Sequence, residues 1–189
     1  MHSNRPHFIL ASASPRRLQL LQQIGLVPDE IIHADIDESP RKDELPDKYA
    51  IRVAQEKAAA VNATYPNAIV LAADTVVAAG RRILPKAEDE KTARACLEIL
   101  SGRRHRVYTA VCVGMRCTLV MTQVRFSRLS KDDIEKYIAT HEWQGKAGGY
   151  AIQGKAEAFI PWIGGSYSNV VGLPIAETCA LLKHAGLTW

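Results

Sequence analysis

The sequence contains few aromatic residues and has only a small excess of positive charge. Aromatic residues make up 6% of the 189 residues, too few for a surface on which nucleic-acid bases stack. Lysine and arginine number 24 against 20 acidic residues, and a net charge of +4 does not by itself imply stable nucleic-acid binding. The apolar run at residues 8–13 is too short for a signal peptide or a membrane span, so we expect a cytoplasmic protein.

Cysteine is also scarce. The four cysteines, Cys96, Cys112, Cys117 and Cys179, have neither CxxC spacing nor the density of a disulfide scaffold. We expect them to be buried, reduced side chains that pack as small hydrophobic groups. The six histidines are scattered singly, so the sequence contains no zinc motif.

The remaining composition is that of a globular protein. Apolar residues account for 47% of the chain and charged residues for 23%, which excludes disorder and fibrous structure. The length and the absence of a long linker predict one domain over residues 1–189.

The apolar pattern predicts an α/β fold, with an elongated mixed β-sheet flanked by helices. The helices we expect are residues 14–24, 47–64, 88–100, 130–140 and 174–186. The strands we expect are residues 8–11, the start of 29–41, 68–73, 76–80 as the return of a hairpin, 107–113, 118–126, and a hairpin of 156–163 with 166–171. Strands thus alternate with helices early in the chain and form hairpins later.

One candidate site is the segment of residues 12–17, Ser-Ala-Ser-Pro-Arg-Arg, between an expected strand and an expected helix. Amides at a helix start, two hydroxyl groups (Ser12 and Ser14) and two guanidinium groups (Arg16 and Arg17) would suit a phosphate. Taken alone, this pattern fits an ordinary capped helix with solvated arginines somewhat better.

A second group consists of acidic residues. Asp74 directly follows six apolar residues, and such strand ends are where ligands often bind. Together with a carboxylate from another segment it could hold a divalent cation such as magnesium. For Asp35 and Asp37, in the loop that also contains Glu38, a solvated position is the favoured interpretation.

A third group consists of the lysines Lys57, Lys86 and Lys146, which together with Arg16 and Arg17 could neutralise a polyphosphate. The sequence has no GxxxxGK[ST] loop, no GxGxxG after a strand and no GxSxG, which disfavours P-loop enzymes, Rossmann dehydrogenases and serine hydrolases. Neither serine of the first segment has an evident histidine partner.

These motifs resemble those of the Maf family, in the order in which that family carries them. The matching segments are residues 10–17, 56–58, 73–75, 100–103, 146–154 and 171–174, so the resemblance covers nearly the whole chain.

The resemblance implies a nucleoside triphosphate pyrophosphatase with an inosine-triphosphatase-like fold and a divalent metal cation, Mg or Mn. It implies that Asp74 is the general base, that Glu38 lines the same cleft, and that the enzyme forms a homodimer. Joined with the reasoning on carboxylates above, this makes Glu38 the expected second metal ligand beside Asp74. Residues implied to bind the substrate are Ser12, Ser14, Arg16, Arg17, Lys57 and Lys86.

Three positions imply the substrate branch. In having Arg16, Thr75 and Gln153 at these positions, the sequence resembles the branch of the family that acts on dTTP and UTP. The branch that acts on 7-methyl-GTP has tryptophan in place of Arg16. The sequence departs from the usual pattern at residues 84–87, Leu-Pro-Lys-Ala, and at residues 149–151, Gly-Tyr-Ala. These departures leave the base preference open. The alternative substrates are modified pyrimidine nucleotides, 7-methyl-GTP or a broad range of nucleotides.

Two alternatives belong to other functional classes. A non-catalytic nucleotide-binding regulator of cell division would need only the phosphate-binding residues, and the presence of Asp74 with Lys57 and Lys86 favours catalysis over it. An RNA-binding protein would fit the basic isoelectric point, but the sequence lacks interleaved aromatic residues and a recognised module.

Overall fold

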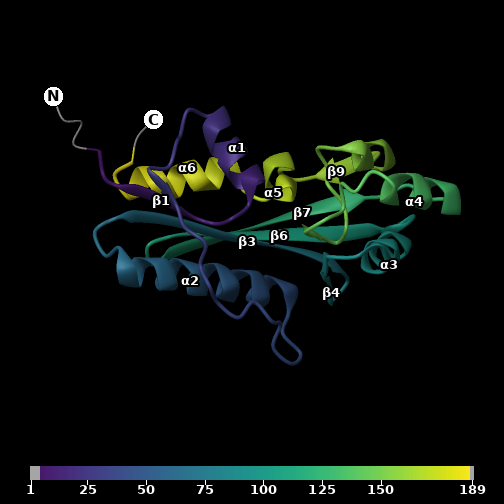
Figure 1. The fold of residues 1–189 in the computed structure, drawn as a ribbon, viewed down its shortest axis with the longest axis horizontal. Helices are drawn as coiled ribbons and strands as arrows, with labels where there is room; N and C mark the ends of the chain where they lie inside the picture. The colour runs from purple at the N-terminus through teal and green to yellow at the C-terminus, as the bar shows by residue number, and fades with distance from the viewer. Residues whose placement is uncertain (1–4, 188–189) are drawn as a thin grey trace.

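The computed structural model describes residues 5–187, which form a mixed β-sheet between two layers of helices (Figure 1). The sheet has the strand order β2-β1-β3-β6-β7-β9, with β4 paired to β3 as a seventh strand. Its strands are β1 (Phe8–Ala11), β2 (Glu30–Ile31), β3 (Ile69–Ala79), β4 (Arg82–Leu84), β6 (Arg104–Val113), β7 (Arg116–Arg125) and β9 (Trp162–Gly164). Strand β1 is parallel to β2 and β3, and the other pairings are antiparallel, so the expected mixed sheet is confirmed.

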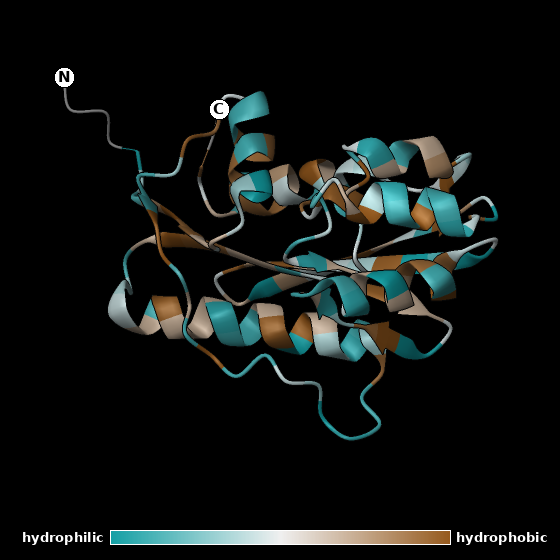
Figure 2. Ribbon diagram, turned by 45° about the vertical axis from the view of Figure 1, so that its right-hand side comes forward, coloured by the Kyte–Doolittle hydropathy of each residue, from teal (hydrophilic) through white to brown (hydrophobic). Residues whose placement is uncertain are grey.

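The helices cover both faces of this sheet. They are α1 (Pro15–Gln23), α2 (Pro46–Thr64), α3 (Glu90–Leu100), α4 (Lys131–Ile138), α5 (Tyr167–Val171) and α6 (Ile175–His184), with a 3₁₀ helix η1 (Lys155–Phe159). Helix α2 lies below the sheet in Figure 1, and α1, α5 and α6 lie above it. In Figure 2, hydrophobic and hydrophilic residues alternate along α2, as expected of a helix that packs one face on a sheet.

Strand β3 separates two hydrophobic clusters because its side chains alternate between the faces of the sheet. Val70, Ala72 and Val76 pack with α2, whereas Leu71 and Val77 pack with the cluster on the opposite face. All five side chains are at most 3% exposed. A buried strand with both faces covered explains the near-continuous apolar run that this part of the sequence shows.

The structure corrects the expected end of this strand. Strand β3 continues to Ala79, and the hairpin turn falls at Gly80, whose φ of +64° suits glycine. Asp74 therefore lies in the middle of the strand, paired with Ala110 of β6. The apolar residues at 76–79 extend the strand because the same antiparallel pairing with β6 continues through Ala78.

The expected hairpin of residues 156–163 and 166–171 is also wrong. The first segment forms η1 and then β9, and the second forms the short helix α5. The Ser166 side chain caps α5 by accepting a hydrogen bond from the backbone amide of Asn169. This local cap outweighs the β-type composition of the segment.

A third correction concerns cysteine. Cys112 and Cys117 form a disulfide across the β6–β7 hairpin, whereas Cys96 and Cys179 are free. Antiparallel pairing around the turn at Gly114 places the two bonded residues directly opposite each other. The expectation of four reduced cysteines is therefore wrong for this pair, because spacing along the sequence does not show which residues face each other across strands.

One edge of β3 is left open in the middle. Strand β1 pairs with residues 69–72 of β3, and β4 pairs with residues 77–79 on the same edge. Between them, residues 73–76 have no strand partner on that side among the described residues. Since neighbouring strand residues point to opposite faces, Asp74 and Thr75 flank this gap on the two faces of the sheet.

A buried aromatic cluster includes Tyr150, the last residue of the glycine-rich segment of residues 144–150 that follows α4. His105 is 2% exposed, and its Nε2 lies 2.7 Å from the Tyr150 hydroxyl oxygen. The His105 ring also contacts the rings of Phe126 and Tyr150 edge to face. Burial lowers the pKa of His105 to about 4. The folded protein therefore keeps this imidazole neutral at pH values where the unfolded chain protonates it.

We predict that the free energy of unfolding falls as the pH drops from about 6.5 to 4, because below 6.5 the unfolded state binds a proton that folded His105 does not. The pKa difference corresponds to about 3 kcal/mol over this window. Urea unfolding across this pH range should show a shallower decline for His105→Gln. The matched control His184→Gln changes an exposed histidine of α6 and should keep the wild-type slope. Parallel curves for wild type and His105→Gln would contradict the prediction.

Candidate functional site

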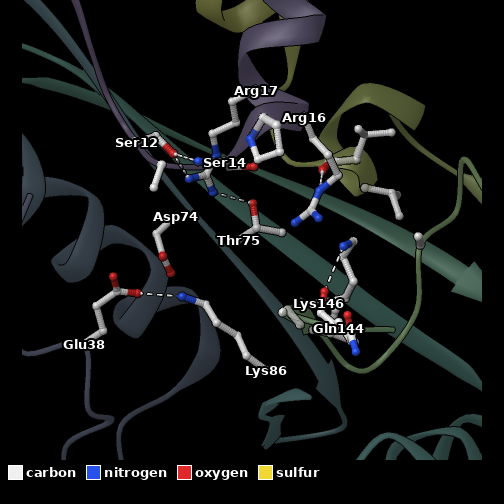
Figure 3. Close-up of a pocket in the computed structure, with 18 of the residues that line it drawn as sticks. Ser12, Ser14, Arg16, Arg17, Glu38, Asp74, Thr75, Lys86, Gln144 and Lys146 are labelled. Carbon is white, nitrogen blue, oxygen red and sulfur yellow. Dashed lines mark hydrogen bonds and ion pairs between the residues drawn. The ribbon is translucent and has the colours of Figure 1, made fainter. Parts of the chain in front are cut away.

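A cleft of about 350 Å³ lies at the open edge of β3 (Figure 3). The β1–α1 turn, the loop before α2, α2 itself, β3 and the segment of residues 144–153 all contribute to its walls. The structure brings together in this cleft every site residue predicted from the sequence, namely Ser12, Ser14, Arg16, Arg17, Glu38, Lys57, Asp74, Thr75, Lys86 and Gln153. Asp35 and Asp37 do not line it, and Asp35 is exposed.

Two carboxylates and two lysines form an ion cluster on one side of the cleft. The Lys57 Nζ lies 2.9 Å from Asp74 Oδ1 and 3.0 Å from Glu38 Oε1, and the Lys86 Nζ lies 3.0 Å from Glu38 Oε2. Burial opposes ionisation of Glu38, but the neighbouring Lys57 and Lys86 outweigh it and lower the pKa of the carboxyl group. The carboxylate side chain of Asp74 is 5% exposed, so its charge is stabilised by Lys57 rather than by water.

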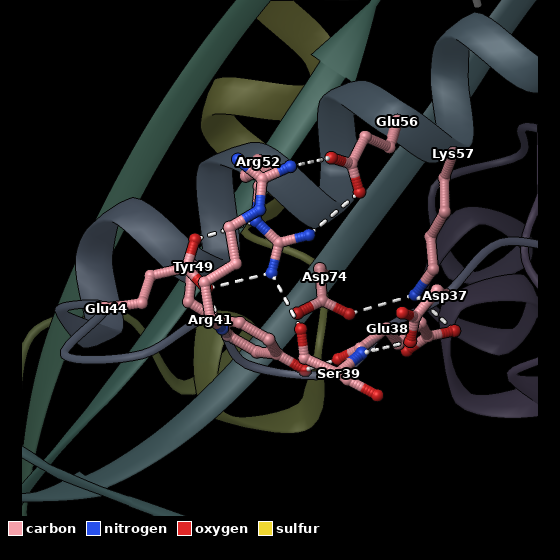
Figure 4. Close-up of polar contacts among 10 residues, drawn as sticks. All are labelled: Asp37, Glu38, Ser39, Arg41, Glu44, Tyr49, Arg52, Glu56, Lys57 and Asp74. Atoms are coloured by element: carbon pink, nitrogen blue, oxygen red, sulfur yellow. Dashed lines mark hydrogen bonds and ion pairs between the residues drawn. The ribbon is translucent and has the colours of Figure 1, made fainter.

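Glu38 lies in a loop without regular structure, and α2 holds this loop in place (Figure 4). The Tyr49 hydroxyl donates to the Glu38 carbonyl at 2.7 Å, and Arg52 donates to the Ser39 carbonyl at 3.1 Å. The Arg52 guanidinium also binds Glu44 at 2.7 Å and Glu56 at 2.9 Å. Sequence reasoning missed Tyr49 and Arg52, because nothing in the helix pattern distinguishes them from ordinary half-buried residues.

Arg17 is a buried residue on the other face of the sheet. It donates to the Gly172 carbonyl at 2.8 Å, to Ser12 Oγ at 2.8 Å and to Thr75 Oγ1 at 3.1 Å. Burial lowers the pKa of its guanidinium, and the charges of Asp74 and Glu38 oppose this shift. Arg17 thereby ties α1 to the segment after α5, and it is more deeply anchored than a solvated helix-start arginine.

Thr75 continues this network into the sheet. Its hydroxyl accepts from Arg17 and lies 3.0 Å from Thr109 Oγ1, which donates to the Asn169 carbonyl at 2.9 Å. Asn169 is fully buried and donates through Nδ2 to the Val107 carbonyl. Thr109 and Asn169 are buried polar positions that the sequence pattern did not single out.

The start of α1 has the geometry of an anion site. Pro15 occupies the first helical position, and the Ser14 side chain makes no capping hydrogen bond. The Ser14 amide instead donates to Ser12 Oγ at 3.2 Å. Pro15 has no amide hydrogen and the Arg17 amide donates to the Ser14 carbonyl at 3.2 Å, so among the described contacts the Arg16 amide is the one left for a ligand oxygen.

The glycine-rich segment forms the wall opposite the ion cluster. Strand β8 (Lys146–Ala147) pairs with β5 (Lys86–Ala87), and Gly148 donates to the Pro85 carbonyl at 3.0 Å. At Gly148 the φ is +67°, and a Cβ there would lie 2.8 Å from the Val77 side chain. Only glycine therefore lets this segment pack on β3 and line the cleft.

The residues present suit a divalent cation that is shared with a substrate. Within residues 5–187 no group of three or more His, Cys, Asp or Glu side chains converges as a metal site. Asp74 and Glu38, however, lie close together, since the Lys57 ammonium contacts Asp74 Oδ1 at 2.9 Å and Glu38 Oε1 at 3.0 Å. Two carboxylates completed by water and phosphate oxygens are a typical magnesium environment.

The comparison with known proteins decides the family. The model of the Maf-like protein family matches residues 7–185. The chain belongs to the Maf family. Within the described residues of this Maf protein, no helix has the length and apolar character needed to cross a membrane.

Curated relatives of this Maf protein include three bacterial proteins named dTTP/UTP pyrophosphatase. The protein of Novosphingobium aromaticivorans is 57% identical over 98% of this chain and 94% of its own length. That of Rhodospirillum rubrum is 61% identical over 94% of this chain and 87% of its own length. That of Gluconobacter oxydans is 60% identical over 95% of this chain and 87% of its own length.

The two neighbouring arginines of α1 should differ in their contribution to stability. We predict that Arg17→Lys lowers the free energy of unfolding by about 2 kcal/mol, because lysine cannot keep the forked set of buried hydrogen bonds. Within residues 5–187 the Arg16 guanidinium makes one hydrogen bond, of 3.3 Å to the Val171 carbonyl, so Arg16→Lys should change stability by less than about 0.5 kcal/mol. Urea denaturation measures both, and equal losses would contradict the anchoring role of Arg17.

Proposed function

We propose that this Maf protein hydrolyses dTTP and UTP to the monophosphate and pyrophosphate. The observation that carries the proposal is the convergence of Asp74, Glu38 and five cationic side chains in one cleft at the open edge of β3. A cleft with more positive than negative side chains suits the triphosphate group of a nucleotide. The relatives are named for their action on these two nucleotides. Modified pyrimidine nucleotides remain candidate substrates.

In the proposed mechanism Asp74 is the general base. Its Oδ1 is bound by Lys57, whereas Oδ2 has no hydrogen-bond partner among the described residues and faces the cleft. Oδ2 accepts a proton from a water molecule, and the oxygen of that water attacks the α-phosphorus. The bond from this phosphorus to the bridging oxygen breaks, and pyrophosphate leaves.

Glu38 and Asp74 would hold the divalent cation, Mg or Mn, which would neutralise phosphate oxygens when bound. The cationic side chains Arg16, Arg17, Lys57 and Lys86 and the first turn of α1 stabilise the charge on the phosphate oxygens. Lys57 has a second role, since its ammonium pairs with Asp74 at 2.9 Å in a nearly buried position. Ser12 orients Arg17 through its hydroxyl group, and the uncapped Ser14 hydroxyl lines the cleft, where it can bind a phosphate oxygen.

Three residues are proposed to set the base preference. The Gln153 side chain is exposed at the cleft and offers an amide that can pair with both the donor and the acceptor groups of uracil or thymine. The Thr75 hydroxyl is already bound to Arg17 and Thr109, so we propose that Thr75 acts by positioning Arg17. Arg16 lines the same cleft and is partly buried, and burial followed by the charge of Arg17 lowers its pKa. That the enzyme forms a homodimer, as the family resemblance implies, stays a prediction.

A panel of nucleoside triphosphates with magnesium or manganese tests the substrate. We expect dTTP and UTP to be converted fastest, with monophosphate and pyrophosphate as products. A ranking led by 7-methyl-GTP, or one without preference, would replace the pyrimidine assignment. Nucleotide binding without any hydrolysis would instead support a non-catalytic regulator.

We predict that Asp74→Asn lowers kcat for dTTP by about 10³-fold, since the variant loses the proton acceptor while keeping the shape of the side chain. Circular dichroism and dTTP binding should stay close to wild type. The matched control Asp35→Asn removes a carboxylate of the neighbouring loop that does not line the cleft, and it should keep wild-type turnover. Turnover of Asp74→Asn within a few-fold of wild type would rule out the general-base role.

A further inference from the structure

The two sides of the cleft differ in chemistry. The ion cluster and the start of α1 supply charges and amides, which suit phosphate groups. The remaining wall is largely apolar, and its apolar members are Ala147, Tyr150, Ala151, Ile152, Val170 and Val171. A flat pyrimidine ring can bury its faces against such a wall, whereas a phosphate gains nothing there. Figure 3 shows Lys146 and Gln144 across the cleft from Glu38 and Asp74.

Lys146 is the lysine of the sequence motifs that the proposed mechanism leaves without a role. It is half-buried, and its Nζ donates to the Gln144 carbonyl at 2.9 Å. An ammonium group has three N–H donors, so two remain for a ligand. Within residues 5–187 no carboxylate lies within ion-pair distance of Lys146, whereas Lys57 and Lys86 are both paired with acids.

The position of Lys146 is set by the backbone around it. Lys146 lies in strand β8, where it pairs with Ala87 of β5, and the Gly145 amide donates to the Ala87 carbonyl at 2.9 Å. The side chain is directed by its bond to Gln144. A charged donor fixed in this way is suited to recognising one ligand atom.

Arg16 lies on the same side of the cleft. Figure 3 shows its guanidinium and the Lys146 ammonium extending toward the same space. Burial, followed by the charge of Arg16, lowers the pKa of Lys146, and Glu142 opposes the shift. Arginine and lysine both donate hydrogen bonds and accept none, so this part of the cleft requires acceptor atoms on the ligand.

We propose that Lys146 donates a hydrogen bond to the 4-carbonyl oxygen of uracil or thymine and thereby excludes cytosine nucleotides. This inference rests on the proposed function and deepens it. Uracil and thymine carry an acceptor oxygen at position 4, whereas cytosine carries an amino group, which is a donor. A donor-only ammonium facing that amino group leaves both groups unpaired, and such mismatches discriminate strongly between related substrates.

The test compares UTP with CTP in three variants of one residue. Lys146→Met removes the donors, Lys146→Gln adds an acceptor, and Lys146→Arg keeps a donor-only group. We expect the UTP-to-CTP ratio of kcat/KM to fall at least tenfold in the first two variants and to stay within about threefold of wild type in the third. Lys183→Met, which changes an exposed lysine of α6, is the matched control and should keep the wild-type ratio.

Equilibrium binding supplies a readout that does not depend on turnover. Calorimetry with UMP, CMP and pyrophosphate should show that Lys146→Met loses the preference for UMP over CMP and binds pyrophosphate as wild type does. An equal loss for UTP and CTP, accompanied by weaker pyrophosphate binding, would make Lys146 a phosphate ligand and overturn the inference. Wild type that binds UMP and CMP equally would also overturn it.

These outcomes can be told apart from a failure of the proposed function. That function fails if wild-type enzyme hydrolyses neither UTP nor dTTP, whatever the Lys146 variants do. The inference about Lys146 fails if the UMP preference exists and survives in Lys146→Met, even when hydrolysis of UTP is confirmed.

Discussion

The buried ion pair between Lys57 and Asp74 is the interaction on which the site depends. It holds the Asp74 carboxylate, in the middle of the largely apolar strand β3, at 2.9 Å from the Lys57 ammonium. Removing one partner of such a pair leaves an uncompensated buried charge, which generally costs several kcal/mol. Lys57 also contacts Glu38, so a single side chain of α2 links the strand to the loop before the helix. The relative positions of the two carboxylates therefore follow from the packing of α2 on the sheet.

The gap in the edge of β3 makes this carboxylate accessible. Because β1 ends at Ala11 and β4 begins pairing at Val77, residues of both sheet faces meet at one opening. Asp74 and the ion cluster lie on the α2 face, and Thr75 and Arg17 lie on the other. The Arg17 hydrogen bonds to Ser12, Thr75 and Gly172 join the start of α1 to the segment after α5, so that three distant parts of the chain form one wall.

Much of this arrangement could be predicted from the sequence. Helix boundaries such as Pro15 and the Ser130 capping box are local signals, and the structure contains both. The ten predicted site residues meet in one cleft because the loops, strands and helices that carry them surround the open edge. Their catalytic and binding roles stay predictions.

Other features depend on contacts between distant segments, which a single sequence does not show. The pattern of residues 68–80 could not show that Asp74 lies within a strand, since that follows from pairing with β6. Tyr49 and Arg52 resemble ordinary helix residues until the loop that they hold is in place. The Cys112–Cys117 bond follows from hairpin register, and the short helix α5 follows from its cap at Ser166.

The central claim is that this cleft directs water to the α-phosphorus of a pyrimidine nucleotide. Hydrolysis of dTTP in ¹⁸O-labelled water, with mass spectrometry of both products, tests it most directly. The account predicts one labelled oxygen in dTMP and none in pyrophosphate. Label in pyrophosphate, or the appearance of labelled inorganic phosphate with dTDP, would contradict it.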